Sequence, residues 1–224
     1  SHAVTKGLDP NVPMKDSGVE WLGEIPEHWE VKKTKNIFNL IVEPAHSNNN
    51  YELLSIYTDI GVKPRKELEQ KGNKSTTTDG YWKVKKNDII VNKLLAWMGA
   101  IGVSEYEGVT SPAYDILRPK KGVNSFFYHL LFRTKKAQTE FKKWSRGIME
   151  MRLRLYFSEF GQIKMPKPSY EEQLKIIKYL DEKTVKIDNL IEKSNKSIEL
   201  LKEKRTALIS AAVTGKIDVR EMAA

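Results

Sequence analysis

Some side chains in this sequence have the types and spacing that nuclease chemistry requires. Asp59, followed by Glu69 and Lys71, fits the Asp…Glu-x-Lys pattern in which two carboxylates hold Mg²⁺ near a scissile phosphate. However, Glu-x-Lys also occurs at Glu30-Val31-Lys32 and at Glu140-Phe141-Lys142. In a chain that is 30% charged, such repetition is expected by chance. We therefore do not predict a nuclease.

A second candidate chemistry is amino-group methylation. The segment Ser111-Pro112-Ala113-Tyr114 differs by one residue from the Ser-Pro-Pro-Tyr type of motif that holds a target amine. A methyltransferase would also need a glycine-rich strand-to-helix turn for its cofactor, and Gly99-Ala100-Ile101-Gly102 lacks that setting. The sequence has no phosphate-binding loop and no metal-ligand spacing among its histidines. We predict no catalytic residue, no metal site and no cofactor.

The remaining chemistry is binding, for which cationic, hydroxyl and aromatic side chains suit DNA. The polar stretch at 71–78 is predicted to be an exposed loop, either a DNA-contacting loop or an ordinary solvated one. A second group of candidates, Arg146, Arg152 and Arg154, lies between the predicted helix and the last strand of the N-terminal region. Trp97 is a DNA contact or a core residue. The predicted DNA-binding residues are Lys71, Lys74, Thr76, Lys93, Trp97, Arg146, Arg152 and Arg154.

The distribution of charge supports a polyanionic partner. The chain carries a net charge of +9, and residues 1–167 hold 27 Lys and Arg against 19 Asp and Glu. The excess of +8 therefore lies in the N-terminal region, while residues 168–224 are nearly balanced. Nucleic acid is the usual partner of such a domain because phosphate neutralisation releases counterions. The alternative is a lysine-rich surface that only favours solubility.

Composition also suggests where the chain works. It contains no cysteine, which excludes disulfides and thiolate metal sites and favours a reducing compartment. No apolar run is long enough to span a membrane, and no N-terminal stretch has the order of a signal peptide. We expect a cytoplasmic protein that does not bind membranes.

The C-terminal region is predicted to be one long helix. Ser169 and Glu172 form a capping box after two prolines, and apolar residues then recur with a period of 3.5. A helix over 171–213 would be about 65 Å long and would need a partner helix to cover its apolar seam. The alternative is a helix folded back on its own domain. The predicted dimer-interface residues are Ile177, Leu180, Ile187, Ile191, Ile198, Leu201 and Leu208.

The N-terminal region is predicted to mix α and β structure. Residues 125–144 have helical periodicity, and residues 81–84, 88–93, 114–118 and 163–165 have strand composition. Trp21 and Trp29 are expected to anchor the N-terminal segment to the core. The predicted fold class is α+β, with a mixed α/β globular domain at 1–165 followed by a coiled-coil helix and a short tail at 166–224.

Three segments, in order, resemble the specificity subunits of type I restriction–modification systems. Residues 16–29 (DSGVEWLGEIPEHW) resemble the opening of many of these subunits. Residues 88–94 (DIIVNKL), 99–102 (GAIG) and 111–114 (SPAY) resemble the middle of their target-recognition domains. Residues 166–168 (PKP) and 215–218 (GKID) resemble the beginning and the end of their conserved helix.

This resemblance implies a subunit that recognises double-stranded DNA, performs no chemistry and docks methylase and restriction subunits. Members normally carry two recognition domains and two conserved helices, whereas this sequence has one of each. It is therefore a natural half-subunit or a fragment of a longer chain. A half-subunit would form a homodimer through antiparallel helices and recognise an inverted, bipartite target. The alternatives are a free-standing dimeric DNA-binding regulator and a scaffold whose basic face is incidental.

Overall fold

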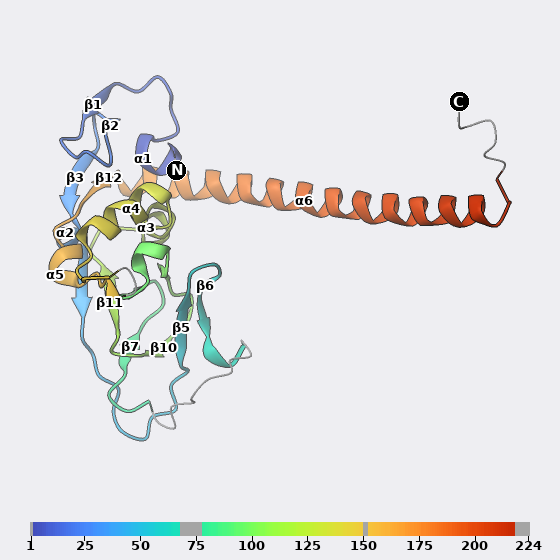
Figure 1. The fold of residues 1–224 in the computed structure, drawn as a ribbon. Helices are drawn as coiled ribbons and strands as arrows, with labels where there is room; N and C mark the ends of the chain where they lie inside the picture. Colours follow the sequence, from blue (N-terminus) through green and yellow to red (C-terminus); the bar gives the residue numbers. More distant parts are fainter. Residues whose placement is uncertain (1, 68–77, 150–151, 218–224) are drawn as a thin grey trace. The chain divides into compact units, whose positions relative to one another are not determined.

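The computed structural model of the chain describes residues 2–67, 78–149 and 152–217 (Figure 1). By its internal contacts the chain divides into two compact units, Ser1–Ile177 and Lys178–Ala224. The first unit combines small antiparallel sheets with short helices and the first turns of a long helix, α6, and the second unit contains the rest of that helix. The predicted fold class, a mixed α and β domain followed by a long C-terminal helix, is confirmed.

A four-stranded antiparallel sheet forms the centre of the first unit. Its strand order is β4 (Phe38–Ile41), β11 (Tyr114–Pro119), β8 (Ile89–Asn92) and β9 (Ile101–Val103). Every residue of β8 is buried, which explains its continuous apolar run instead of the alternation typical of a strand with one solvated face. Asn92 at the end of β8 pairs with Tyr114 at the start of β11.

Four two-stranded sheets surround the central one. They pair β1 (Met14–Asp16) with β2 (Glu24–Pro26), β3 (Glu30–Lys33) with β12 (Lys164–Lys167), β5 (Leu54–Tyr57) with β6 (Gly61–Pro64), and β7 (Trp82–Val84) with β10 (Gly108–Thr110). Gly108 allows β10 to approach the chain at Glu52, because a Cβ there would overlap the Glu52 carbonyl oxygen.

Two helices, α3 (Ser125–Phe132) and α4 (Lys135–Trp144), replace the single helix predicted over 125–144. The break occurs because the Thr134 hydroxyl accepts a hydrogen bond from the Ala137 backbone N–H and begins a new helix there. The helices bury an aromatic cluster, in which rings pack edge to face or tilted at centroid distances of 5.1–6.2 Å. Its members are Phe38, Phe127, Tyr128, Phe132, Phe141 and Phe160. The remaining short helices are α1 (His2–Lys6), α2 (Thr34–Ile37), α5 (Phe157–Phe160), η1 (Arg65–Glu67) and η2 (Ala96–Met98).

A charged network crosses the central sheet. Arg118 on β11 donates two hydrogen bonds of 2.9 Å to the buried carboxylate of Asp88 and one of 2.8 Å to Glu43. The hydrogen bond from Arg118 holds the pKa of Glu43 below its ordinary value. Because the Arg118 guanidinium binds both carboxylates, it connects the segment before β8, which contains Asp88, with the segment after β4, which contains Glu43.

Helix α6 (Tyr170–Val213) is continuous over 44 residues, within one residue of the predicted start. The predicted cap is present, since the Ser169 hydroxyl accepts a hydrogen bond of 3.2 Å from the Glu172 backbone N–H. Gln173, fully buried, donates to the carbonyls of Gly122 and Pro168 and accepts from the Asn124 N–H. These bonds fix the first turns of α6 within the first unit.

The second unit consists of the rest of α6, whose apolar seam is exposed in the single chain. Ile187, Ile191, Ile198, Leu201 and Leu208 are all exposed. Other large apolar residues of this unit, among them Val185, Leu190 and Leu200, are exposed as well, so nothing within this unit buries the seam. In the described part of the chain, no helix is both long and apolar enough to cross a membrane.

Candidate DNA interface

One end of the central sheet gathers several of the predicted DNA-binding residues. Lys93 directly follows β8, and its ammonium lies 3.3 Å from Asp115 and donates a hydrogen bond of 3.1 Å to the Pro112 carbonyl. Burial raises the pKa of Asp115, while Lys93 opposes that rise. Lys93 therefore fixes the turn before β11, and its charge is partly balanced. Its contact with DNA stays a prediction.

Trp97 lies in η2, which packs against α4. The ring is half-buried, its indole N–H donates to the Leu94 carbonyl at 3.0 Å, and the Lys142 ammonium lies 5.0 Å from the ring centroid. One face of the ring thus carries a cation. The sequence left open whether Trp97 is a core residue or a DNA contact. Its half-buried ring lies between these two alternatives.

Arg146, Arg152 and Arg154 lie in a short hairpin at 146–154, of which residues 150–151 are outside the described part. Arg146 and Arg154 exchange two backbone hydrogen bonds of 2.9 Å. The next residue, Leu155, is buried and donates its N–H to the Lys93 carbonyl at 2.8 Å. The hairpin is therefore attached to the end of β8, beside Lys93, although about 50 residues separate them in the sequence.

The base of the 146–154 hairpin is held by an ion pair. The Arg146 guanidinium lies 2.7 Å from Glu159, whose side chain is largely buried on α5. Arg154 donates a hydrogen bond of 3.2 Å to the Arg152 carbonyl. Arg146 thus supports the hairpin, whereas the Arg152 side chain is exposed. Two of the three arginines have a local structural partner, and their contact with phosphates stays a prediction.

The other predicted DNA-binding residues belong to the loop expected at 71–78. Lys71, Lys74 and Thr76 lie outside the described residues, between η1 and the segment that begins at Thr78.

A group of tyrosines and cations lies around the start of β11 and was not among the residues predicted from the sequence. Burial raises the pKa of Tyr114, Tyr57 adds to the rise and Arg65 opposes it, so these side chains share one electrostatic environment. Nearby, the Lys63 ammonium donates a hydrogen bond of 3.0 Å to the Tyr106 hydroxyl. The available signal was the pair of tyrosines in 51–57 followed by the three cations in 63–66, since such mixtures suit bases and phosphates.

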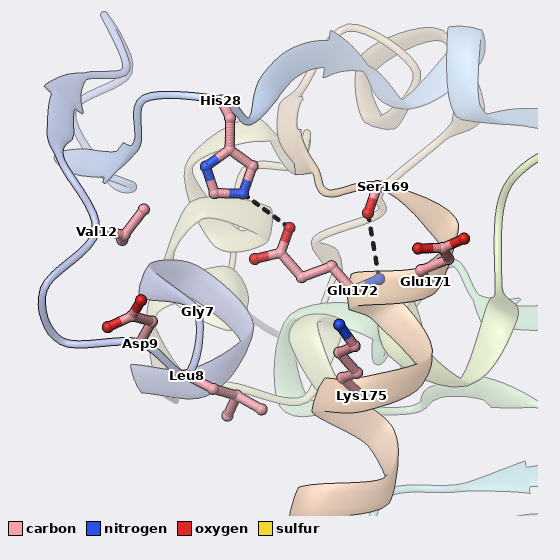
Figure 2. Close-up of a pocket in the computed structure, with 9 residues that line it drawn as sticks. All are labelled: Gly7, Leu8, Asp9, Val12, His28, Ser169, Glu171, Glu172 and Lys175. Atoms are coloured by element: carbon pink, nitrogen blue, oxygen red, sulfur yellow. Dashed lines mark hydrogen bonds and ion pairs between the residues drawn. The ribbon is translucent and has the colours of Figure 1, made fainter.

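A cavity of 380 Å³ lies elsewhere, beside the start of α6. Figure 2 shows its lining, in which His28 and Glu172 lie 3.0 Å apart and Lys175 faces the same space. Asp9, Glu171 and Glu172 make this lining acidic, which does not suit a phosphate backbone. Among the described residues, no group of three or more His, Asp or Glu side chains could hold a metal ion.

Residues 26–200 match a family described as "Type I restriction modification DNA specificity domain". Two curated relatives come from Methanocaldococcus jannaschii. The type I restriction enzyme MjaIX specificity subunit is 26% identical over 81% of this chain and 43% of its own length. The MjaVIII specificity subunit is 27% identical over 97% and 52%, respectively. The chain thus spans about half the length of these relatives.

Solved structures show the same fold. The HsdS subunit from Thermoanaerobacter tengcongensis superposes with a TM-score of 0.56 at 16% identity, over 86% of this chain and 46% of that one. A chain from a structure of "complex assembly and conformational transition of the type I R-M system" gives a TM-score of 0.54 at 17% identity, over 84% and 46%. At these identities the likeness concerns the fold alone.

Proposed function

Because this chain belongs to the family of type I restriction modification DNA specificity domains, we propose that it recognises the DNA target of such a system. The observation that carries the proposal is the family match over residues 26–200. The excess positive charge of residues 1–167 agrees with a polyanionic partner. In this proposal the chain has no catalytic residue and no cofactor, and it works in the cytoplasm.

Each part of the chain has a separate role in this proposal. Residues 1–165 form the target-recognition domain, and residues 166–224 form a dimerising and spacing helix. The domain contacts double-stranded DNA through the 146–154 hairpin, the segment around Lys93 and Trp97, and the loop with Lys71, Lys74 and Thr76. A methylase subunit and a restriction subunit dock on the chain and supply the chemistry.

A reconstitution tests the recognition. The chain is combined with the adenine methylase subunit of the same restriction system, and methylated positions in a random DNA library are sequenced. We expect methylation confined to one bipartite sequence, and none when the chain is left out. Sequence-preferred DNA binding without stimulation of any methylase would support instead a free-standing regulator. For a specificity subunit and for a regulator alike, DNA binding should weaken steeply as the salt concentration rises. A scaffold whose basic face is incidental should show no sequence preference.

We further propose that two copies pair through antiparallel α6 helices and recognise two inverted half-sites. The exposed seam of α6 supports this, since a helix of this length does not leave such a stripe in water. Light scattering at micromolar concentration is expected to give the mass of a dimer. The double variant Ile191→Asp with Leu201→Asp should be monomeric, because charges on the seam would be buried without partners.

A matched control carries the same added charge at outer positions of the helix. The variant Asn189→Asp with Ser210→Asp leaves the seam intact, so it should remain a dimer. A monomer in the unaltered protein would refute the self-pairing and leave a second half of a longer chain as the partner of α6.

A further inference from the structure

Strands β5 and β6 form a hairpin whose two faces differ (Figure 1). The side chains of one face are buried: Leu54, Ile56, Val62 and Pro64. Successive side chains of a strand point to opposite faces, so the residues between them share the other face. We call it the β5–β6 face, and its partly exposed side chains are Ser55, Tyr57, Lys63 and, directly after β6, Arg65. One side of the hairpin thus packs in the core, while the other presents a tyrosine and two cations.

The turn of this hairpin is fixed to the end of the central sheet. Arg133, which ends α3, donates hydrogen bonds to the carbonyls of Thr58 at 2.6 Å and Asp59 at 3.1 Å. The same guanidinium donates to the carbonyl of Gly99 at 3.1 Å, directly after η2. The β5–β6 hairpin is therefore attached to the segment around Trp97 that is proposed to contact DNA. A surface that is ordered in advance loses less conformational entropy on binding.

The ammonium of Lys63 is held on the β5–β6 face by a tyrosine. It donates a hydrogen bond of 3.0 Å to the Tyr106 hydroxyl and lies 5.5 Å from the centroid of that ring. This hydrogen bond raises the pKa of Lys63, so the side chain is a cation at neutral pH. An ammonium has three donors, and Tyr106 takes one of them. Lys66 forms an ion pair with Glu52 instead, so its charge is already balanced.

The β5–β6 face continues to the start of β11. Tyr114 there is partly buried and is paired with Asn92, the residue before Lys93. Burial raises the pKa of Tyr114, and both Tyr57 and Arg65 act on it as well, so these two side chains lie beside it. The cations of the β5–β6 face and Lys93 therefore flank the same tyrosine, and together they extend the positive charge at this end of the sheet.

We propose that the β5–β6 face holds the sugar–phosphate backbone of the DNA target, with Lys63 and Arg65 bound to phosphate oxygens. Phosphate contacts are made by such side chains and set the register of a protein on DNA without reading its sequence. The two residues are about 7 Å apart along an extended segment, so they contact separate phosphates. A guanidinium has five donors, so Arg65 can keep a partner within the protein and still bind a phosphate.

This inference rests on the proposed function, since it assumes that the chain binds its target DNA. It adds a surface that contributes to affinity and leaves the sequence preference to other contacts.

The test is the salt dependence of DNA binding. Each neutralised phosphate contributes about 0.9 to the slope of log affinity against log salt concentration. The slope of the double variant Lys63→Gln with Arg65→Gln should therefore be smaller by about 1.8. Raising the salt from about 50 to about 200 mM should then weaken binding by the unaltered protein about 12-fold more than binding by the variant. At low salt the variant should lose affinity equally for the target and for a random duplex.

The measurement is fluorescence anisotropy with two duplexes, one selected from a random library with the unaltered chain and one of random sequence. Lys121→Gln is the matched control, because it removes an exposed lysine that follows the opposite end of β11. Its slope should equal that of the unaltered protein. The exchange Lys63→Arg with Arg65→Lys disturbs the same side chains but keeps both charges, so its slope should also be unchanged. A reduced slope in this exchange variant would refute the phosphate contacts and indicate an altered fold.

The outcomes distinguish this inference from the proposed function. If the chain prefers a sequence but the double variant keeps the full slope, or loses affinity for the target alone, the phosphate contacts are wrong and DNA recognition stands. If the slope falls as expected but the unaltered chain selects no sequence, the phosphate contacts stand and the recognition function fails.

Discussion

The closure of the 146–154 hairpin can be tested by a single methyl group. In Gly147→Ala, the new Cβ would lie 2.5 Å from the Arg152 carbonyl oxygen, whereas ordinary contact begins near 3.4 Å. The neighbouring atoms are backbone, so the arms must separate and the two Arg146–Arg154 hydrogen bonds of 2.9 Å are lost. Each of these hydrogen bonds contributes about 1 kcal/mol, so their loss makes closure of the hairpin less favourable by about 2 kcal/mol.

The expected effect on DNA binding follows from that shift. If only the closed hairpin binds, the affinity falls with the closed fraction, by up to about 30-fold. The hairpin opens without exposing the core, so the melting temperature should fall by no more than about 8 °C. Anisotropy titration gives the affinity, and hydrogen exchange at the Arg146 and Arg154 amides reports the opening directly.

Gly18→Ala is the matched control for this variant. Gly18 also has a positive φ, 64°, but no atom lies within 4 Å of its added Cβ. The Gly18→Ala variant should therefore have a lower free energy of unfolding but an unchanged affinity for DNA. If Gly147→Ala exchanged its hairpin amides faster yet bound the target with unchanged affinity, the argument that the closed hairpin positions the DNA contacts would be refuted.

Three further predictions concern binding and stability. Arg152→Ala and Arg154→Ala should each weaken specific DNA binding by about 1–3 kcal/mol in titrations, with melting temperatures unchanged; unchanged affinity in both would remove this segment from the interface. Burial lowers the pKa of His129 to about 4, below its unfolded value of about 6.5, so protonation favours unfolding. Stability should therefore be highest above pH 6.5 and fall between pH 6.5 and 4, and His129→Gln should remove up to about 3 kcal/mol of that fall in denaturant titrations; parallel curves would contradict the assignment. Gln173→Leu should lower the free energy of unfolding by about 2–4 kcal/mol, because it removes the partner of the buried Pro168 carbonyl and of two partly buried backbone groups, the Gly122 carbonyl and the Asn124 N–H. An unchanged denaturation midpoint would show that these groups find other partners.

The sequence was sufficient for elements defined by local chemistry. The capping residue Ser169 and the 3.5-residue period located α6 to within one residue. The apolar run of β8 and the strand composition of β11 identified these two strands of the central sheet, since each signal lies within the strand itself. Trp29 was expected as an anchor, and it is buried.

Elements that depend on competing local signals or on distant partners were less accessible. The apolar face common to α3 and α4 concealed the helix start at Thr134, because periodicity continues through a break whose evidence is a single hydroxyl. The link between Lys93 and Leu155 could not be predicted, since a backbone hydrogen bond across about 60 residues leaves no mark on residue types. For the same reason the sequence proposed the arginines of the hairpin and Lys93 separately.

The joint at Gln173 contains no charge, whereas the proposed DNA contacts are mostly ionic. Its three hydrogen bonds are made by a neutral, fully buried amide, so dissolved ions neither screen nor compete with them. Contacts between arginines and phosphates weaken steeply as salt rises. Raising the ionic strength should therefore release DNA from the chain while the start of α6 stays locked, so that the protein can be stripped of nucleic acid and recovered in its folded form.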